Sequence, residues 1–160
     1  MTPLAWLLGL FLPACGYPGI SGLPVPRLMD MTHITRPDTP NTALAAPAGY
    51  SPPPDIVTPV FPITASSLLA KVMLVARAQP RTFQAAEFPR QMQVHYVARS
   101  RIFNFPDLVT VQVAPAAAGS STLVLYSRSV YGRSDLGVNH KRLETWLSAL
   151  QHSITPTSER

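Results

Sequence analysis

Ionisable residues are scarce in this chain of 160 residues, of which 13% are Asp, Glu, Lys or Arg. This share is about half of that in an average soluble protein. A single cysteine excludes an internal disulfide, a thiolate zinc cluster and a CxxC redox pair. Glycine is also sparse, at 8 residues, and neither GxGxxG nor GxxxxGK[ST] occurs. The sequence therefore offers no disulfide framework and no glycine-rich nucleotide loop.

Histidine and positive charge are present, but not in the patterns that metal or nucleic-acid binding requires. The histidines show no HxH, HxxxH or HExxH spacing, so we expect no metal site; they are His33, His95, His140 and His152. The formal net charge of +5 is modest, and few aromatic residues accompany the basic ones, so we expect no nucleic-acid partner. No cofactor is predicted.

A short apolar run opens the chain. Leu4–Leu12 is almost entirely apolar, whereas a helix that crosses a bilayer needs about 20 such residues. Its length is typical of a secretory signal peptide. The sequence Leu12-Pro13-Ala14-Cys15 resembles a bacterial lipobox, whose cysteine is lipidated, and Gly16 is compatible with transfer to the outer membrane.

A signal peptide is therefore predicted over residues 1–15, with lipidation at Cys15. This predicts an exported protein of the cell envelope that is anchored to the membrane and faces the periplasm. Two chains or more, each contributing roughly 0.8 kcal/mol per buried CH₂, would hold it stably. Pro13 and the absence of Lys or Arg before the run depart from the usual pattern, so a plain cleaved signal is the alternative.

Proline is in excess, with 18 residues in the chain and 11 of them among the 47 residues Gly16–Pro62. Proline has no backbone donor and pushes the preceding residue toward extended geometry. We therefore expect neither a helix nor a central strand in this segment. Residues 16–55 are interpreted as a disordered, semi-rigid linker.

A folded α+β module is predicted over residues 56–155. Apolar residues recur at helical spacing in Thr64–Gln79 and again from Asn139 to Ile154. Between these helices the alternation predicts four strands, over residues 81–87, 92–103, 107–113 and 122–131. The order predicts an antiparallel four-stranded sheet flanked by an N-terminal and a C-terminal helix on one face. The other face is expected to be solvated or to bind something.

The segment Tyr126–Arg142 resembles the signature of a bacterial family, domain of unknown function 1499. The matching positions are Ser127, Ser129, Gly132, Ser134, Asp135, Gly137, Asn139 and Arg142. Phe105-Pro106-Asp107 also resembles the family, and the likeness covers about Ile56–Leu150. Tyr126 and Val130 stand where the family usually has arginines. The resemblance implies a fold and an exported or membrane-attached setting, but no established chemistry.

Cations gather on the module, where ten Lys and Arg against four Asp and Glu give about +6 over Ile63–Ile154. Arg99 and Arg101 are expected to project from one strand face, and Arg128 from a neighbouring strand. Lys141 is expected in the first turn of the last helix, where free backbone amides attract anions. Serine, aspartate and asparagine would shape the loop and cap that helix. The predicted anion site comprises Arg99, Arg101, Arg128, Ser134, Asp135, Asn139 and Lys141.

Each of these groups also has a purely structural interpretation. Arg101 can pair with Asp107 or Asp135, and Lys141 can be solvated. Ser134 and Asp135 can serve as turn residues whose side chains bind nearby backbone amides.

These observations predict a small binding or accessory module of the envelope that grips an anionic group. The competing enzyme class is a hydrolase that uses Ser127, Ser129 or Ser134. The spacing pairs no histidine with any of these serines, and no GxSxG nucleophile elbow occurs, so no catalytic residue is predicted. A third class is a structural protein that packs against another envelope protein.

Overall fold

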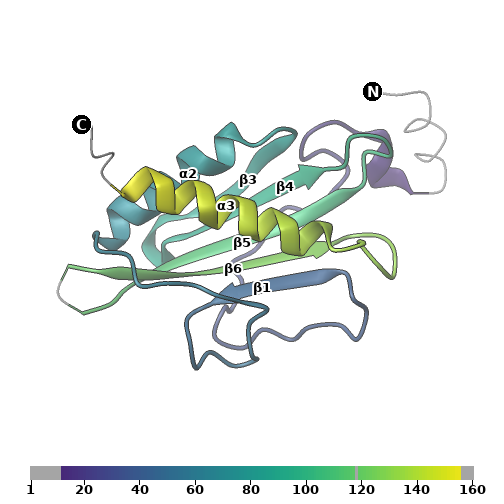
Figure 1. Ribbon diagram of the computed structural model, residues 1–160. Coiled ribbons are helices and arrows are strands. Elements are labelled where there is room, and N and C mark those ends of the chain that lie inside the picture. The colour runs from purple at the N-terminus through teal and green to yellow at the C-terminus, as the bar shows by residue number, and fades with distance from the viewer. Residues whose placement is uncertain (1–11, 118, 156–160) are drawn as a thin grey trace.

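Six strands form one mixed sheet in the computed structural model, which describes residues 12–117 and 119–155 (Figure 1). The strand order is β2-β1-β6-β5-β4-β3. β1 and β2 run parallel, and all other neighbours are antiparallel. The strands are β1 (Thr42–Ala46), β2 (Ile56–Val57), β3 (Thr82–Phe88), β4 (Gln93–Arg99), β5 (Pro106–Pro115) and β6 (Ser121–Ser129).

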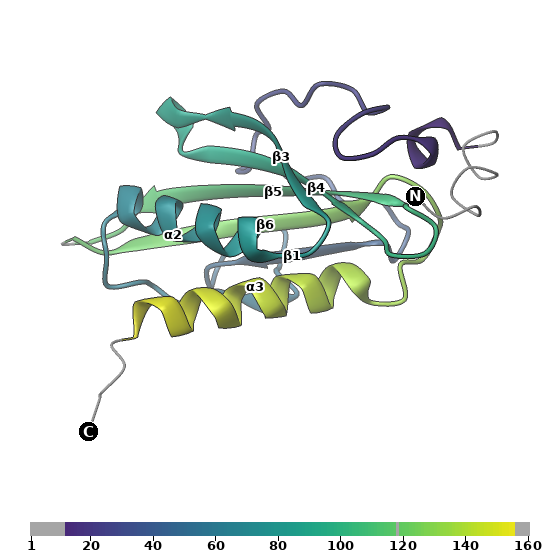
Figure 2. The ribbon, with the colours of Figure 1, turned by 90° about the horizontal axis from the view of Figure 1, so that it is seen from above.

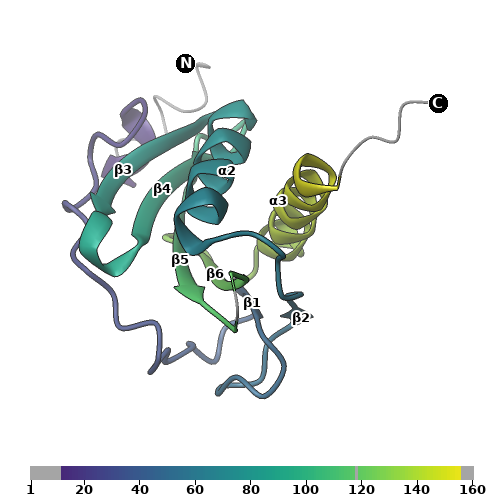
Figure 3. The same ribbon diagram turned by 90° about the vertical axis from the view of Figure 1, so that its left-hand side faces the viewer.

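Two α-helices, α2 (Ala65–Ala78) and α3 (Val138–Ile154), cover one face of the sheet (Figures 2 and 3). Thr64 caps α2, since its side-chain oxygen accepts a hydrogen bond from the amide of Ser67 at 3.3 Å. The α+β class and the two helices on one face are confirmed. Two short 3₁₀ turns, η1 (Pro13–Gly16) and η2 (Pro89–Gln91), complete the elements of the described residues.

The main core lies between the helices and the sheet. Val109 and Val111 of β5 point toward the helices, as their alternation with Thr110 predicts. Tyr96 of β4 packs edge-on against Trp146 of α3, with ring centroids 5.6 Å apart. Period-two apolar residues on the strands therefore meet a period-3.6 stripe on each helix.

The prediction that no central strand forms in the proline-rich segment is wrong for β1, and the same segment also supplies the edge strand β2. β1 lies inside the sheet between β2 and β6, and four of its five residues are buried. Pro40 and Pro47 bracket β1, but Asn41–Ala46 contains no proline, so every residue of the strand keeps its N–H. The sheet is therefore six-stranded and mixed rather than four-stranded and antiparallel.

The part of the proline-rich segment that precedes β1 crosses the sheet face that the helices leave uncovered (Figures 2 and 3). We call residues 12–41 the N-terminal arm. Met31 and Ile34 of the arm are buried together with Leu44 and Tyr126 in a second apolar cluster. The arm, interpreted from sequence as disordered, thus forms a third layer of the domain.

Candidate functional site

Arg99, at the end of β4, fixes the beginning of the arm. Its side chain is buried, and Nε donates to the carbonyl of Gly19 at 2.6 Å. Nη1 donates to the carbonyls of Ala14 at 2.7 Å and Asn104 at 3.0 Å, and Nη2 donates to that of Ser21 at 2.9 Å. Every guanidinium nitrogen is therefore occupied, and Arg99 has a structural role in this arrangement.

Gln93, at the other end of β4, fixes the arm a second time. Its side-chain oxygen accepts from the amide of Met29 at 2.8 Å, and its side-chain nitrogen donates to the carbonyl of Met29 at 2.8 Å. This pair of bonds copies the pairing of two backbone strands. Because Gln93 and Arg99 lie on the same face of β4, the arm spans the distance between two fixed points.

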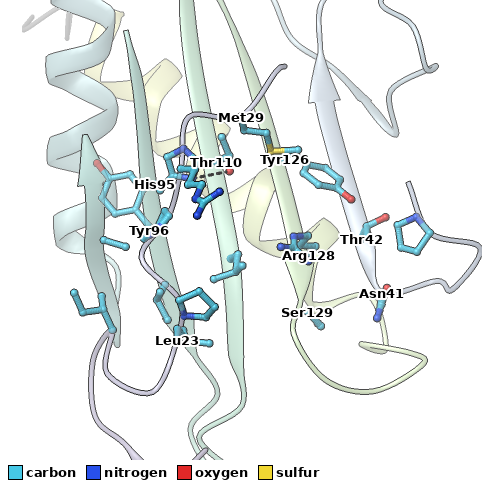
Figure 4. Close-up of a pocket in the computed structure, with 18 of the residues that line it drawn as sticks. Leu23, Met29, Asn41, Thr42, His95, Tyr96, Thr110, Tyr126, Arg128 and Ser129 are labelled. Atoms are coloured by element: carbon cyan, nitrogen blue, oxygen red, sulfur yellow. Dashed lines mark hydrogen bonds between the residues drawn. The ribbon is translucent and has the colours of Figure 1, made fainter. Parts of the chain in front are cut away.

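A pocket of about 870 Å³ lies between the arm and the sheet, and we call it the arm pocket (Figure 4). Its volume is in the range of small-molecule sites, roughly 300–1,000 Å³. The strands supply Val97, Leu108, Thr110, Tyr126 and Arg128 to its floor, and the arm supplies Leu23, Pro24, Val25 and Met29 to its wall.

The charges that line the arm pocket all have one sign. Among the described residues, three charged side chains line it, Arg27, Arg36 and Arg128, and no Asp or Glu does. Arg36 is already paired, with its guanidinium 2.8 Å from Asp55. The side chains of Arg27 and Arg128 are exposed and make no hydrogen bond or ion pair within the described ranges. The pocket therefore holds uncompensated positive charge.

His95 lines the same floor as a neutral group. One ring nitrogen lies 2.7 Å from the side-chain oxygen of Gln93, and the other lies 3.2 Å from the hydroxyl of Thr110, the contact dashed in Figure 4. Burial lowers the pKa of His95 below its ordinary value. Since both nitrogens have partners, His95 adds neither charge nor a free donor to the pocket.

The residues of the signature segment form a buried polar network on the opposite, helix-covered face. Arg142 donates to Asp107 at 2.7 Å, to the hydroxyl of Ser127 at 3.0 Å and to the amide oxygen of Asn139 at 2.6 Å. Ser127 also donates to that amide oxygen, and the Asn139 side-chain nitrogen donates to the carbonyl of Asn41 at 3.1 Å. The network therefore ties β5, β6, α3 and the residue before β1 together.

Asp135 closes the loop that leads into α3. Its carboxylate accepts from the amides of Gly137 at 3.0 Å and Asn139 at 2.9 Å. Gly137 occupies the N-cap position at φ 79°, a left-handed conformation that favours glycine. The prediction that Asn139 caps the helix is therefore wrong, because Asn139 lies in the first turn with a fully buried side chain. Ser134 accepts from the amide of Leu136 at 3.3 Å, as a turn residue does.

The structure separates the predicted anion site into different places. β5 lies between β4 and β6, so the prediction that Arg128 sits on a strand next to Arg99 is wrong. β4 ends at Arg99, which leaves Arg101 exposed in the following turn rather than on the strand. Lys141 is exposed on α3, and the pair that forms with Asp107 uses Arg142 and not Arg101. Of the predicted residues, Arg128 alone lines the arm pocket.

The serines of the hydrolase alternative have structural partners. Ser127 is fully buried between Asn139 and Arg142, and Ser129 accepts from Asn139 at 3.0 Å. In the part of the chain that the structure describes, no histidine nitrogen is hydrogen-bonded to Ser127, Ser129 or Ser134. Residues 12–117 and 119–155 contain no group of three His, Cys, Asp or Glu placed to hold a metal ion.

The fold and site define a small α+β domain with helices on one sheet face and an arm-covered pocket on the other. The chain belongs to the DUF1499 family, a family described as a protein of unknown function, whose sequence model matches residues 34–150. The resemblance based on Tyr126–Arg142 is thus confirmed, and the match begins in the arm, earlier than Ile56. None of the curated proteins matches the chain.

Replacing Arg142 tests whether the signature network holds the domain together. Arg142→Met leaves the carboxylate of Asp107 buried without its partner. We therefore expect the free energy of unfolding of the full chain, measured by urea denaturation, to fall by about 3–5 kcal/mol. Arg133→Met, at an exposed loop position, is the matched control and should change it by less than about 0.5 kcal/mol. Equal effects of the two substitutions would contradict this role.

Proposed function

We propose that the domain is a binding module that takes a ligand with an anionic group in the arm pocket, and that Arg128 holds the anion. One observation carries the proposal: Arg128 projects into a pocket without carboxylates and has no partner among the described residues. The planar guanidinium of arginine binds a carboxylate or a phosphate through two parallel hydrogen bonds. A ligand anion would complete this pair.

The surroundings of Arg128 favour such binding. Leu108 and Thr42 are its cross-strand neighbours, and Tyr126 precedes it by two residues on the same face of β6. Leu108 and Tyr126 offer apolar contact area beside Arg128, whose side chain is exposed and accessible to a ligand. Neutral His95 leaves the positive charge of the pocket on the arginines.

We also propose that the protein is exported and anchored to the envelope membrane through lipidated Cys15. Of the three arm carbonyls that Arg99 holds, those of Gly19 and Ser21 follow Cys15 and that of Ala14 precedes it. Cleavage before Cys15 would therefore leave most of this arm contact in place. The Cys15 side chain is fully buried in this arrangement, so an acylated Cys15 must leave this position.

The apolar run that precedes Cys15 lies almost wholly outside the described residues. Within residues 12–117 and 119–155, no helix has the length and apolar character needed to cross a membrane. The proposed anchor is thus an acyl group at Cys15 and not a helix of the folded domain.

Substituting Arg128 tests the binding proposal. Small carboxylates and phosphates that bind the full chain should raise its midpoint of thermal unfolding. At 100 times its Kd, a bound anion should stabilise the folded state by about 2.7 kcal/mol. Arg128→Gln should weaken binding about tenfold or more, equal to about 1.4 kcal/mol. Arg133→Gln, on the exposed loop outside the pocket, should leave binding unchanged.

A panel in which no anion shifts the unfolding midpoint would contradict the proposal and favour the structural class of envelope protein. An anion that binds Arg128→Gln as tightly as the unaltered chain would also contradict it.

Substituting Cys15 tests the anchor. Cells that express the full chain should incorporate labelled palmitate into it, and Cys15→Ser should abolish the incorporation because the thiol is the acceptor atom. Incorporation that persists in Cys15→Ser would contradict lipidation at this residue.

A further inference from the structure

We infer that the ligand of the arm pocket is an amphiphile whose acyl or alkyl chain adjoins its anionic group, an inference that rests on the proposed function. A row of side chains across the sheet carries it. The strand register places Val97, Leu108, Arg128 and Thr42 side by side on β4, β5, β6 and β1. The row changes from apolar to cationic between β5 and β6. A ligand that follows this row needs an apolar part directly beside its charge.

The spacing of the strands excludes a small anion as the full occupant of this row. Neighbouring strands lie about 4.8 Å apart, so the β4 position of Val97 is roughly 10 Å from the β6 position of Arg128. Acetate or orthophosphate bound to Arg128 cannot reach across that distance. Figure 4 shows Leu23 of the arm on the side of β4 and Thr42 on the side of β1, with Arg128 between them. Leu23 therefore adds an apolar side chain of the arm at the apolar end of the row.

The next row of side chains offers no competing polar site. The register places His95, Thr110 and Tyr126 side by side on β4, β5 and β6. His95 and Thr110 bond to each other, and the second ring nitrogen of His95 contacts Gln93. Polar groups that are already satisfied can adjoin hydrocarbon without the cost of an unmade hydrogen bond. The part of the pocket over His95, Thr110 and Tyr126 therefore suits an apolar chain.

The size and charge of the pocket agree with one such chain. About 870 Å³ is enough for a drug-sized molecule. Arg27 of the arm supplies a second guanidinium without a partner among the described residues. A fatty acid and a monoacyl lipid phosphate share the required chemistry, a hydrocarbon chain beside a carboxylate or a phosphate.

Photolabelling of the full chain in isolated membranes tests this inference. The probe is decanoic acid with a diazirine in the distal half of its chain, and the labelled peptides are identified by mass spectrometry. We expect labels on the peptides that contain Leu23, Val97 or Leu108. Decanoate and decyl phosphate should compete at least about tenfold more effectively than acetate or orthophosphate. The relative strength of decanoate and decyl phosphate distinguishes a free fatty acid from a lipid phosphate.

Matched variants assign the two ends of the ligand. Arg128→Gln should reduce labelling by decanoic acid about tenfold, whereas Arg133→Gln should not. Leu108→Trp fills the apolar end of the row and should abolish labelling. Leu74→Trp, at an exposed position of α2 on the other face, is its control. If Leu108→Trp does not fold, Leu108→Asn replaces it as the test. Leu108→Asn removes apolar surface without adding volume and should weaken labelling.

Three results would overturn the inference. Competition by acetate or orthophosphate that equals competition by decanoate would leave the anion site of the proposed function intact but exclude the amphiphile. Equal labelling by a diazirine-bearing decanol, unaffected by Arg128→Gln, would exclude the anionic group as a determinant. Labels confined to α2 and α3, together with no response to any anion, would exclude both the inference and the proposed function.

Discussion

Four backbone carbonyls converge on the guanidinium of Arg99, and the arm pocket depends on this contact because it holds one wall of the pocket in place. Six of the thirty residues of the arm are prolines, which interrupt the regular N–H pattern that strand pairing needs, while the carbonyls of the arm still need donors. Side chains of the sheet and its turns supply them: Asn104 donates to Cys15 and Tyr17, and Gln93 donates to Met29. The proline content that argues against secondary structure thus remains compatible with an ordered layer.

The two faces of the sheet divide the work of the domain. On the helix face, Asp107, Ser127, Asn139 and Arg142 form a closed network that fixes α3 and the loop before it. On the other face, the arm pocket has an unpaired Arg128 and no carboxylate among the described residues that line it. Most residues of the sequence signature therefore hold the domain together. Within Tyr126–Arg142, only Tyr126, Arg128 and Ser129 line the arm pocket, among the described residues.

Local patterns predicted those elements that depend on local interactions. The apolar stripes of Thr64–Gln79 and of the C-terminal segment predicted both helices, and alternation predicted the four strands β3 to β6. In the structure, Tyr96 faces the helices, whereas His95, Val97 and Arg99 lie on the opposite face of β4, as period-two alternation requires. The long-range contacts had no local signal: nothing near Arg99 indicates that its partners lie about 80 residues earlier. β1 was not predicted because the high proline content of Gly16–Pro62 as a whole conceals the proline-free run Asn41–Ala46.

Hydrogen exchange of the arm in the full chain is the measurement that tests most directly whether the arm is a wall of the domain. The amide of Met29 donates to Gln93, a fully buried side chain, so the peptide around Met29 should exchange slowly. Gln93→Leu should accelerate its exchange while the amides of β5 stay protected. Exchange of the unaltered arm at the rate of an unstructured peptide would contradict the account, because the sheet face would then be open and the arm pocket would not exist.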